Sequence, residues 1–266
     1  TKNFISFLLY PLSAITYLIN ITKKFSNKRN FEIKTICIGN IFLGGTGKTS
    51  LAIEINQLLK KKFKTVFIKK KYENQSDEIN LLNNKGNIIS STSRKNALLT
   101  AINKKYQLAI LDDGLQQKNI NYDLKIACFN SEYGIGNEYM IPAGPLRENL
   151  NEVKNYDLIF LNGEKKNNKL LSKLRSINKN LKIFQGKYKP LNLKNFDLRK
   201  KYIMFCGIGN PHEFEQTLIK YKFKISKKII YPDHYKITNT DLKRLINKGK
   251  KENLILVTTE KDFFRL

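Results

Sequence analysis

A glycine-rich segment of the sequence could bind a nucleotide. It reads Gly44-Gly45-Thr46-Gly47-Lys48-Thr49, and it lies between a run that predicts a strand and a pattern that predicts a helix. The backbone N–H groups of such a loop, with the helix N-terminus that follows, bind phosphates. In this pattern Lys48 reaches the β- and γ-phosphates and the Thr49 hydroxyl binds Mg²⁺. Phe42 stands where the full pattern begins with glycine, but the flanking elements still predict a P-loop that binds ATP or GTP.

Two adjacent carboxylates could complete this nucleotide site. Asp112 and Asp113 follow directly after residues 108–111, an apolar run typical of a parallel strand buried on both faces. A carboxylate at the end of a strand beside a P-loop can bind Mg²⁺ or its water ligands. The same two residues followed by Gly114 would also suit a simple turn. Because the P-loop is present, we interpret the pair as metal-binding.

The elements that must position these residues alternate between strands and helices. The first part of the chain predicts strands at 31–38, 65–68, 108–111, 124–129 and 158–161, with helices at about 48–61 and 94–104. A second series predicts strands at 202–206, 225–231 and 254–257, with helices at 211–221 and 239–247. This alternation predicts an α/β fold: a P-loop NTPase-like, mostly parallel sheet with helices on both faces, plus a second, smaller α/β lobe.

The N-terminal segment is apolar from residue 4 to residue 19 and contains Pro11, which is expected to kink a helix. A helix of that length reaches ~24 Å, which is less than the ~30 Å hydrocarbon core of a membrane. Basic residues follow it, so we interpret it as an interfacial, membrane-associated helix. A buried core helix and a cleaved signal peptide are the alternatives. The predicted parts are therefore this helix (1–25), a P-loop core domain (26–186) and a smaller C-terminal α/β domain (187–266).

The composition restricts the classes of function. The formal net charge is +27, but of the 49 basic residues 42 are Lys and only 7 are Arg. Nucleic-acid recognition commonly uses the bidentate guanidinium of Arg, so we expect no nucleic-acid partner. The charge still attracts anionic surfaces such as acidic lipid headgroups. Cys37, Cys128 and Cys206 lie far apart without a C-x-x-C pair, which argues against a disulfide scaffold or a zinc ribbon.

Several strings of the sequence resemble, in the same order, those of the tetraacyldisaccharide 4′-kinase family of lipid A biosynthesis. Besides the P-loop, they are Gly39-Asn40, Asp112-Asp113-Gly-Leu-Gln116, Pro142-Ala-Gly-Pro-Leu-Arg-Glu148, Gly207-Ile-Gly-Asn-Pro211, Asp233-His234 and Thr259-Glu-Lys-Asp262. Each string alone is moderately specific. Their ordered combination is highly specific, and it covers nearly the whole chain.

The resemblance implies ATP-dependent phosphorylation of the 4′-hydroxyl of a tetraacyl glucosamine disaccharide 1-phosphate, which yields lipid IVA. It implies a peripheral or monotopic enzyme at the cytoplasmic face of the bacterial inner membrane. The expected partners are this lipid A precursor and a membrane surface with anionic lipids, with ATP as the second substrate and Mg²⁺ as the metal. No obligate protein partner is expected.

The resemblance also implies roles for individual residues. Asp77 would be the catalytic base, His234 would pair with it, and Lys48 would act on the transferred phosphate. A weakly acidic sugar hydroxyl needs a carboxylate to take its proton, and an imidazole can orient that carboxylate. Asp112 and Asp113 occupy the metal-binding positions. The residues that would bind the substrate or its phosphate groups are Gln116, Arg147, Arg94, Lys70 and Glu78.

Three of these assignments have alternatives. The family usually has Arg-Gly-Tyr where this chain has Lys69-Lys70-Lys71-Tyr72. Lys70 can replace the arginine as a point charge but not as a bidentate fork. The short spacing after Tyr72 also leaves Glu78 or Glu73 as alternative bases. Arg94 could instead belong to a solvated helix face.

Two other classes of protein share parts of these patterns. P-loop GTPases also carry Gly-Gly-x-Gly-Lys-Thr, but Thr259-Glu-Lys-Asp262 lacks the Lys-x-Asp spacing with which they read guanine. A nucleic-acid-binding ATPase would fit the charge, but the sequence has no signature of a common nucleic-acid-binding module. The sequence therefore favours a lipid kinase.

Overall fold

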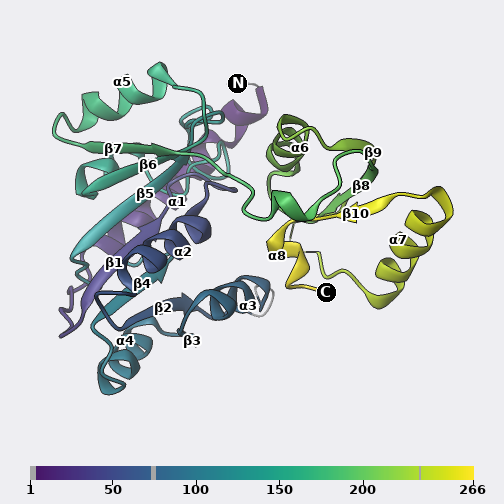
Figure 1. Cartoon of the computed structure of the whole chain (residues 1–266). Helices are drawn as coiled ribbons and strands as arrows, with labels where there is room; N and C mark the ends of the chain where they lie inside the picture. Colours follow the sequence, from purple (N-terminus) through teal and green to yellow (C-terminus); the bar gives the residue numbers. More distant parts are fainter. Residues whose placement is uncertain (1–3, 73–75, 234) are drawn as a thin grey trace. The chain divides into compact units, whose positions relative to one another are not determined.

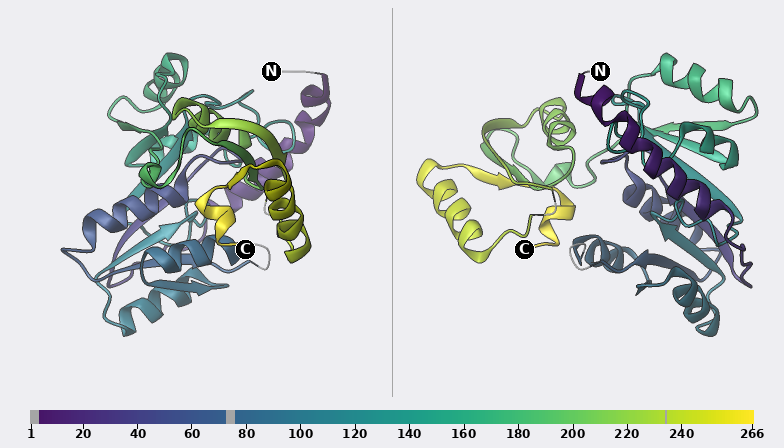
Figure 2. Two further views of the ribbon diagram at one scale, coloured as in Figure 1. Left: turned by 45° about the vertical axis from the view of Figure 1, so that its right-hand side comes forward. Right: turned by 180° about the vertical axis from the view of Figure 1, so that it is seen from behind.

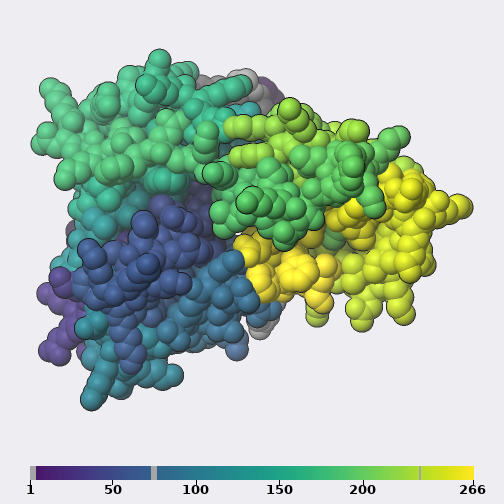
Figure 3. Space-filling view, in the orientation of Figure 1, coloured from purple at the N-terminus to yellow at the C-terminus, as the bar shows by residue number. Residues whose placement is uncertain are grey.

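The computed structural model describes residues 4–72, 76–233 and 235–266. The chain divides into two compact units (Figure 1): unit 1 comprises Thr1–Lys71 and Lys85–Lys187, and unit 2 comprises Tyr72–Asn84 and Tyr188–Leu266. The sequence analysis assigned residues 72–84 to the P-loop domain, whereas the contacts group them with the C-terminal residues. Within each unit, side chains fill the spaces between the ribbons (Figure 3).

Unit 1 is built on a seven-stranded sheet with the strand order β3-β2-β4-β1-β5-β6-β7. Every pair of neighbouring strands is parallel, which confirms the predicted parallel sheet. The strands are β1 (Lys34–Gly39), β2 (Thr65–Lys70), β3 (Ile88–Ser91), β4 (Leu108–Asp112), β5 (Leu124–Asn130), β6 (Leu158–Asn162) and β7 (Lys182–Gly186). Two of them, β3 and β7, were not predicted, because these edge strands are short and partly polar.

Helices cover both faces of this sheet. The N-terminal helix α1 (Phe4–Lys24) and helix α2 (Lys48–Leu59) lie on opposite faces (Figure 1; Figure 2, right). The other helices of unit 1 are α4 (Arg94–Asn103), α5 (Asn168–Ile177) and the 3₁₀ helix η1 (Leu150–Asn155). Because both faces are covered, the central strands are apolar, and every residue of β4 is buried.

The register of the central strands brings the predicted site residues to one edge of the sheet. Asp112 pairs with Ile38 of β1 on one side and with Lys69 of β2 on the other. The carboxyl ends of these three strands are therefore neighbours, and the loop after β1 is the glycine-rich segment. This is the edge at which parallel α/β sheets commonly bind ligands.

Helix α1 is longer than the apolar run predicted, and it continues through Pro11 as one helix of 21 residues. At ~1.5 Å per residue it extends about 31 Å. Among the described helices it alone is long and apolar enough to cross a membrane, by length and composition, and only 6% of its most apolar stretch is buried. The alternative of a buried core helix is therefore wrong.

Unit 2 is the predicted second α/β lobe. Its parallel sheet has the order β10-β8-β9, with β8 (Lys201–Cys206), β9 (Lys224–Ile230) and β10 (Ile255–Val257). Its helices are α3 (Ser76–Lys85), α6 (Pro211–Lys220), α7 (Asn239–Glu252), α8 (Glu260–Phe263) and the 3₁₀ helix η2 (Leu193–Asn195). Helix α7 starts with a capping box, in which Thr238 and Asp241 each accept a hydrogen bond from the other's backbone N–H.

Candidate active site

The glycine-rich loop has the backbone geometry of an anion-binding site. Gly44 and Gly47 have φ angles of +126° and +85°, values that favour glycine. Helix α2 begins at Lys48 directly after Gly47, and no side chain caps its N-terminus. The first N–H groups of a helix have no partner within the helix, so they can bind a phosphate here.

Phe42, which replaces the first glycine of the pattern, does not disturb this loop because its side chain turns toward the protein. It is half-buried and packs against the core of unit 1. Asn40 stabilises the loop, since its side-chain amide donates hydrogen bonds to the backbone oxygens of Phe42 and, at 3.3 Å, of Gly44. The sequence analysis named the Gly39-Asn40 string but assigned no role to Asn40.

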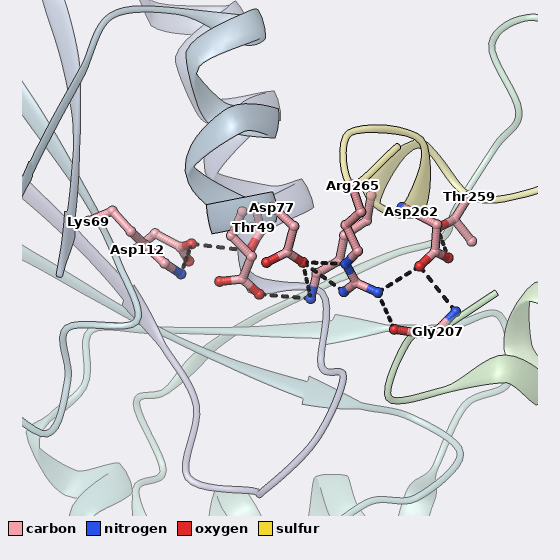
Figure 4. A network of polar contacts seen from close by, with 10 residues as sticks. Thr49, Lys69, Asp77, Asp112, Gly207, Thr259, Asp262 and Arg265 are labelled. Atoms are coloured by element: carbon pink, nitrogen blue, oxygen red, sulfur yellow. Dashed lines mark hydrogen bonds and ion pairs between the residues drawn. The ribbon is translucent and has the colours of Figure 1, made fainter. Parts of the chain in front are cut away.

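Thr49 and Asp112 meet beside the loop (Figure 4). The Thr49 hydroxyl donates a hydrogen bond of 3.1 Å to Oδ2 of Asp112, whose side chain is completely buried. Within the described part of the chain, the other carboxylate oxygen, Oδ1, is buried and accepts no hydrogen bond. A hydroxyl and an unsatisfied carboxylate oxygen are hard oxygen ligands, so these residues fit Mg²⁺. In the described residues no group of three or more His, Cys, Asp or Glu could hold a metal ion, and a nucleotide-bound Mg²⁺ needs only one or two carboxylates.

A buried lysine that the sequence analysis missed also contacts this carboxylate. Nζ of Lys69 lies 2.6 Å from Oδ2 of Asp112, and Lys69 is only 3% exposed. Lys70, which was predicted to replace the family's arginine, is the half-buried next residue of β2. Successive side chains of a strand point to opposite faces, so only one of the two lysines can face Asp112. The sequence carries no signal for Lys69, because only the register of β2 against β4 places it opposite Asp112.

Asp113 has a different environment from its neighbour. Its carboxylate forms an ion pair of 2.8 Å with Arg147, and the same Arg147 nitrogen donates to Oδ1 of Asn40 at 2.8 Å. Burial alone would raise the pKa of Asp113, but the charges of Lys48 and Arg147 outweigh it and hold the pKa below its usual value of 3.8. Asp113 therefore stays ionised at neutral pH, and Arg147 remains partly exposed beside the P-loop.

Arg94 is buried at the start of α4, so the alternative of a solvated helix face is wrong. Its guanidinium donates to the backbone oxygen of Asp113 at 2.5 Å and to the side chain of Gln117 at 3.2 Å. It is 7% exposed. Arg94 thus supports the backbone of Asp113, whose φ of +58° lies in the left-handed region that non-glycine residues rarely adopt.

Gln116 connects the loop to a buried acidic residue. Its amide donates to the backbone oxygen of Asn40 at 2.8 Å and to Glu148 at 3.0 Å. Glu148 is 1% exposed. It also forms an ion pair of 2.7 Å with Lys118 and accepts a hydrogen bond of 3.0 Å from the Tyr156 hydroxyl. The sequence analysis assigned no role to Glu148 or Lys118, although Glu148 ends one of the family strings.

The predicted base lies in unit 2. Asp77, at the start of α3, is 4% exposed and forms an ion pair of 2.7 Å with Arg265. Its neighbour Glu78 lies 2.9 Å from Lys261. His234, its predicted partner, and Glu73, an alternative base, both lie outside the described residues. The pairing of Asp77 with His234 therefore stays a prediction.

Comparisons with known proteins identify the family to which this chain belongs. A family model described as tetraacyldisaccharide-1-P 4′-kinase matches residues 5–86 and 66–266. A tetraacyldisaccharide 4′-kinase of Pelagibacter ubique (strain HTCC1062) is 46% identical over 266 residues, covering 99% of this chain and 85% of the relative. Another, of Rickettsia typhi, is 34% identical over 286 residues, covering 99% of this chain and 87% of the relative.

A solved structure has the same fold. It is the "apo" form of LpxK from Aquifex aeolicus in complex with ATP, with a TM-score of 0.71 and 22% sequence identity. The match covers 98% of this chain and 90% of that chain. The family model, the relatives and the ordered motifs agree over nearly the whole length. The chain is therefore a member of the tetraacyldisaccharide 4′-kinase family.

Proposed function

We propose that this chain transfers the γ-phosphoryl group of ATP to the 4′-hydroxyl of a tetraacyl glucosamine disaccharide 1-phosphate, and so forms lipid IVA. The observation that carries the proposal is the meeting of Thr49 with the buried Asp112 at an uncapped P-loop helix. The substrate class comes from family membership: the relatives at 46% and 34% identity are named tetraacyldisaccharide 4′-kinases. The Aquifex aeolicus structure was solved with ATP.

The nucleotide half of the reaction uses residues of unit 1. The backbone N–H groups from Gly44 to Thr49 would hold the phosphates, and Lys48 would stabilise the charge that the γ-phosphate gains during transfer. Thr49, Asp112 and Asp113 would hold Mg²⁺, which would supply positive charge to the phosphates during transfer. Lys69 balances the charge of the buried Asp112 carboxylate through its 2.6 Å contact.

The acceptor half needs a base for a weakly acidic sugar hydroxyl. Asp77 would take the hydroxyl proton while the 4′-oxygen forms a bond to the γ-phosphorus, the bond between that phosphorus and the bridging oxygen breaks, and ADP leaves. His234 would orient Asp77. Five further residues are proposed to bind the substrate or its phosphate groups: Gln116, Arg147, Arg94, Lys70 and Glu78.

Helix α1 supports binding to a membrane, because its polarity is reversed relative to a helix of a soluble protein. Its buried side is polar: Ser6 accepts a hydrogen bond from Asn137 at 3.1 Å, and Ser13 donates one to the backbone oxygen of Met140 at 2.8 Å. Asn20 donates to the backbone oxygen of Arg147 at 2.9 Å.

The outer side of α1 is apolar. Its exposed large side chains are Phe4, Ile5, Phe7, Leu8, Tyr10, Leu12, Ile15, Tyr17, Leu18 and Ile19. Contiguous apolar surface of this extent on a helix with a basic last turn is typical of a lipid-facing element. The proposed location is therefore the cytoplasmic face of the bacterial inner membrane, where anionic lipids would attract the basic turn.

The test is a phosphoryl-transfer assay with γ-labelled ATP and the dispersed lipid disaccharide 1-phosphate. The wild-type protein should label the lipid, and unlabelled ATP should compete with the label far better than unlabelled GTP. Lys48→Ala should remove nearly all transfer while its circular dichroism and melting temperature match the wild type. An unlabelled lipid, or wild-type transfer by a folded Lys48→Ala protein, would contradict the proposal.

A further inference from the structure

A buried ionic cluster in unit 2 joins three segments that lie far apart in the sequence. Asp77 comes from α3, Gly207 follows β8, and Asp262 and Arg265 lie at the C-terminal end of the described chain (Figure 4). Asp77 is 4%, Arg265 5% and Asp262 0% exposed in their side chains. Ionised groups are removed from water in this way only when they are paired and hydrogen-bonded, so the cluster is a built feature of the unit.

The Arg265 guanidinium uses two edges in this cluster. One edge holds Asp77: Nε and Nη2 donate to the same oxygen, Oδ2, at 3.0 and 2.7 Å. The other edge holds the C-terminal segment, since Nη1 donates to Oδ1 of Asp262 at 2.7 Å and to the backbone oxygen of Gly207. The guanidinium is planar and rigid, so fixing one edge also fixes the direction of the other.

The second edge is itself firmly anchored. Asp262 accepts a hydrogen bond from the backbone N–H of Gly207 at 3.1 Å and one from the Thr259 hydroxyl at 2.7 Å. Thr259 also caps α8 by accepting from the backbone N–H of Asp262 at 3.1 Å. These contacts hold Asp262 at the end of the unit 2 sheet. Arg265 therefore connects the carboxylate of Asp77 to a fixed point at the end of this sheet.

Lys261, the lysine near this cluster, cannot hold the Asp77 carboxylate in the way that Arg265 does. Nζ of Lys261 is 3.7 Å from Oδ2 of Asp77, beyond hydrogen-bond distance, and it lies closer to Glu78, at 2.9 Å. An ammonium group also acts as a point charge and does not fix the plane of a carboxylate. Among the basic side chains described around Asp77, Arg265 thus makes the hydrogen bonds that hold its carboxylate oxygen in place.

We propose that Arg265 is a positioning residue for phosphoryl transfer, which holds the Asp77 carboxylate in the orientation that receives the proton of the acceptor hydroxyl. This inference rests on the proposed function, in which Asp77 is the base. Catalysis of phosphoryl transfer depends mainly on positioning and electrostatics, and a misplacement of about 1 Å can cost on the order of 100-fold in rate. It also gives a role to the Gly207–Pro211 and Thr259–Asp262 strings, which the nucleotide site leaves unused.

The experiment compares kcat, KM for ATP and KM for the lipid in Arg265→Met, Arg265→Lys and Asp77→Asn, and in the double variant of Arg265→Met with Asp77→Asn. Arg199→Met is the matched control, because Arg199 also forms a two-hydrogen-bond pair with an aspartate, Asp197, in the same unit, but it is 91% exposed. Circular dichroism and the melting temperature are recorded for every variant.

We expect Arg265→Met to lower kcat about 10- to 100-fold while both KM values stay within about threefold. Arg265→Lys should recover part of the loss, Arg199→Met should behave as wild type, and the double variant should be no slower than Asp77→Asn. A kcat for Arg265→Met equal to that of Arg199→Met, or losses that multiply in the double variant, would overturn the proposal. If Arg265→Met does not fold, Arg265→Lys decides: a lowered kcat at wild-type melting temperature supports the proposal, and an unchanged kcat overturns it.

A second readout separates this inference from the proposed function. Amide hydrogen exchange in α3, after its first turn, should be faster in Arg265→Lys than in wild type, and unchanged in Arg199→Met. If the wild-type protein labels no lipid, the proposed function fails. Positioning of Asp77 by Arg265 would then still be supported by faster exchange, and unchanged exchange would overturn it.

Discussion

Replacing Lys69 by methionine should lower the stability of the protein, because the buried carboxylate of Asp112 would lose its positively charged partner. Lys69 and Asp112 are 3% and 0% exposed, and their charged atoms are 2.6 Å apart. Methionine keeps most of the side-chain volume but removes the charged partner of the buried Asp112 carboxylate. Among the described residues, the neutral Thr49 hydroxyl would then be its remaining hydrogen-bond donor. Breaking a buried ion pair by removing one partner costs about 3–5 kcal/mol.

That cost converts into a large thermal effect. For a body of the size of unit 1, each 1 kcal/mol lowers the melting temperature by about 2–4 °C, so Lys69→Met should melt on the order of 10 °C below wild type. Mg²⁺ with ATP would return positive charge to the same carboxylate. The rise in melting temperature on adding both should therefore be larger in Lys69→Met than in wild type.

The assay is thermal unfolding followed by near-ultraviolet circular dichroism, without ligand, with ATP alone, and with ATP and Mg²⁺. Lys187→Met is the control, because Lys187 forms an exposed ion pair of 3.6 Å with Glu164 in the same unit, and such pairs contribute at most about 1 kcal/mol. If Lys69→Met melts within 1–2 °C of Lys187→Met, the reasoning about the buried pair is refuted. An equal effect of Mg²⁺ in both proteins would refute the link to the metal.

Three further predictions follow from other parts of the structure. On the exposed side of α1, the substitutions Leu8→Asp and Leu12→Asp should weaken binding to vesicles of anionic lipid without changing the melting temperature. On the buried side, Ser13→Leu should lower the melting temperature. Vesicle binding by the aspartate variants equal to that of the wild type would contradict a lipid-facing role. Asp77→Ala should lower kcat by about 10²–10⁴-fold with ATP affinity unchanged, as expected for loss of a base, while Asp112→Ala should make the rate strongly dependent on Mg²⁺ concentration. Burial alone would raise the pKa of Glu152, but the hydrogen bond from Lys24 and the charge of Lys118 hold this pKa below 4.5. The contribution of Glu152 to stability is therefore full above pH 4.5 and is lost as the pH falls through the lowered pKa. From pH 7 to pH 3, the melting temperature of Glu152→Gln should fall less than that of the wild type.

The parts of the fold that could be predicted are those whose local pattern agrees with their final environment. Leu108–Leu111 lies in a buried central strand, and its run of apolar residues predicted that burial. The P-loop has glycines where the backbone requires positive φ. Helix α3, in contrast, has the polar sequence Ser76–Lys85 and carried no clear pattern. Its position depends on ion pairs with residues more than 180 positions away, such as that between Asp77 and Arg265.

The candidate site divides in the same way. Residues within a contiguous motif, such as Thr49 or Asp112, could be assigned from spacing because the loop and the strand end fix them locally. Lys69 could not, because a lysine in a chain with 42 lysines is informative only once its strand register places it opposite Asp112. The burial of Arg94 likewise depends on its contact with the backbone of Asp113, which only the tertiary structure brings within reach.

Helix α1 shows how the structure assigns the faces of a helix that the sequence analysis predicted without assigning its faces. An apolar helix at the surface of a soluble protein is expected to turn its apolar side inward. In α1 the inward residues are Ser6, Ser13 and Asn20, spaced by seven positions, and each forms a hydrogen bond with the segment from Asn137 to Arg147. Seven residues are close to two helical turns, so this spacing places all three on one stripe. In a helix whose other residues are mostly apolar, such a polar stripe marks the side that contacts the protein, and the apolar remainder is exposed. Since the same contacts reach the backbone of Arg147, which pairs with Asp113 at the P-loop, helix α1 and the nucleotide site share one continuous set of hydrogen bonds and ion pairs.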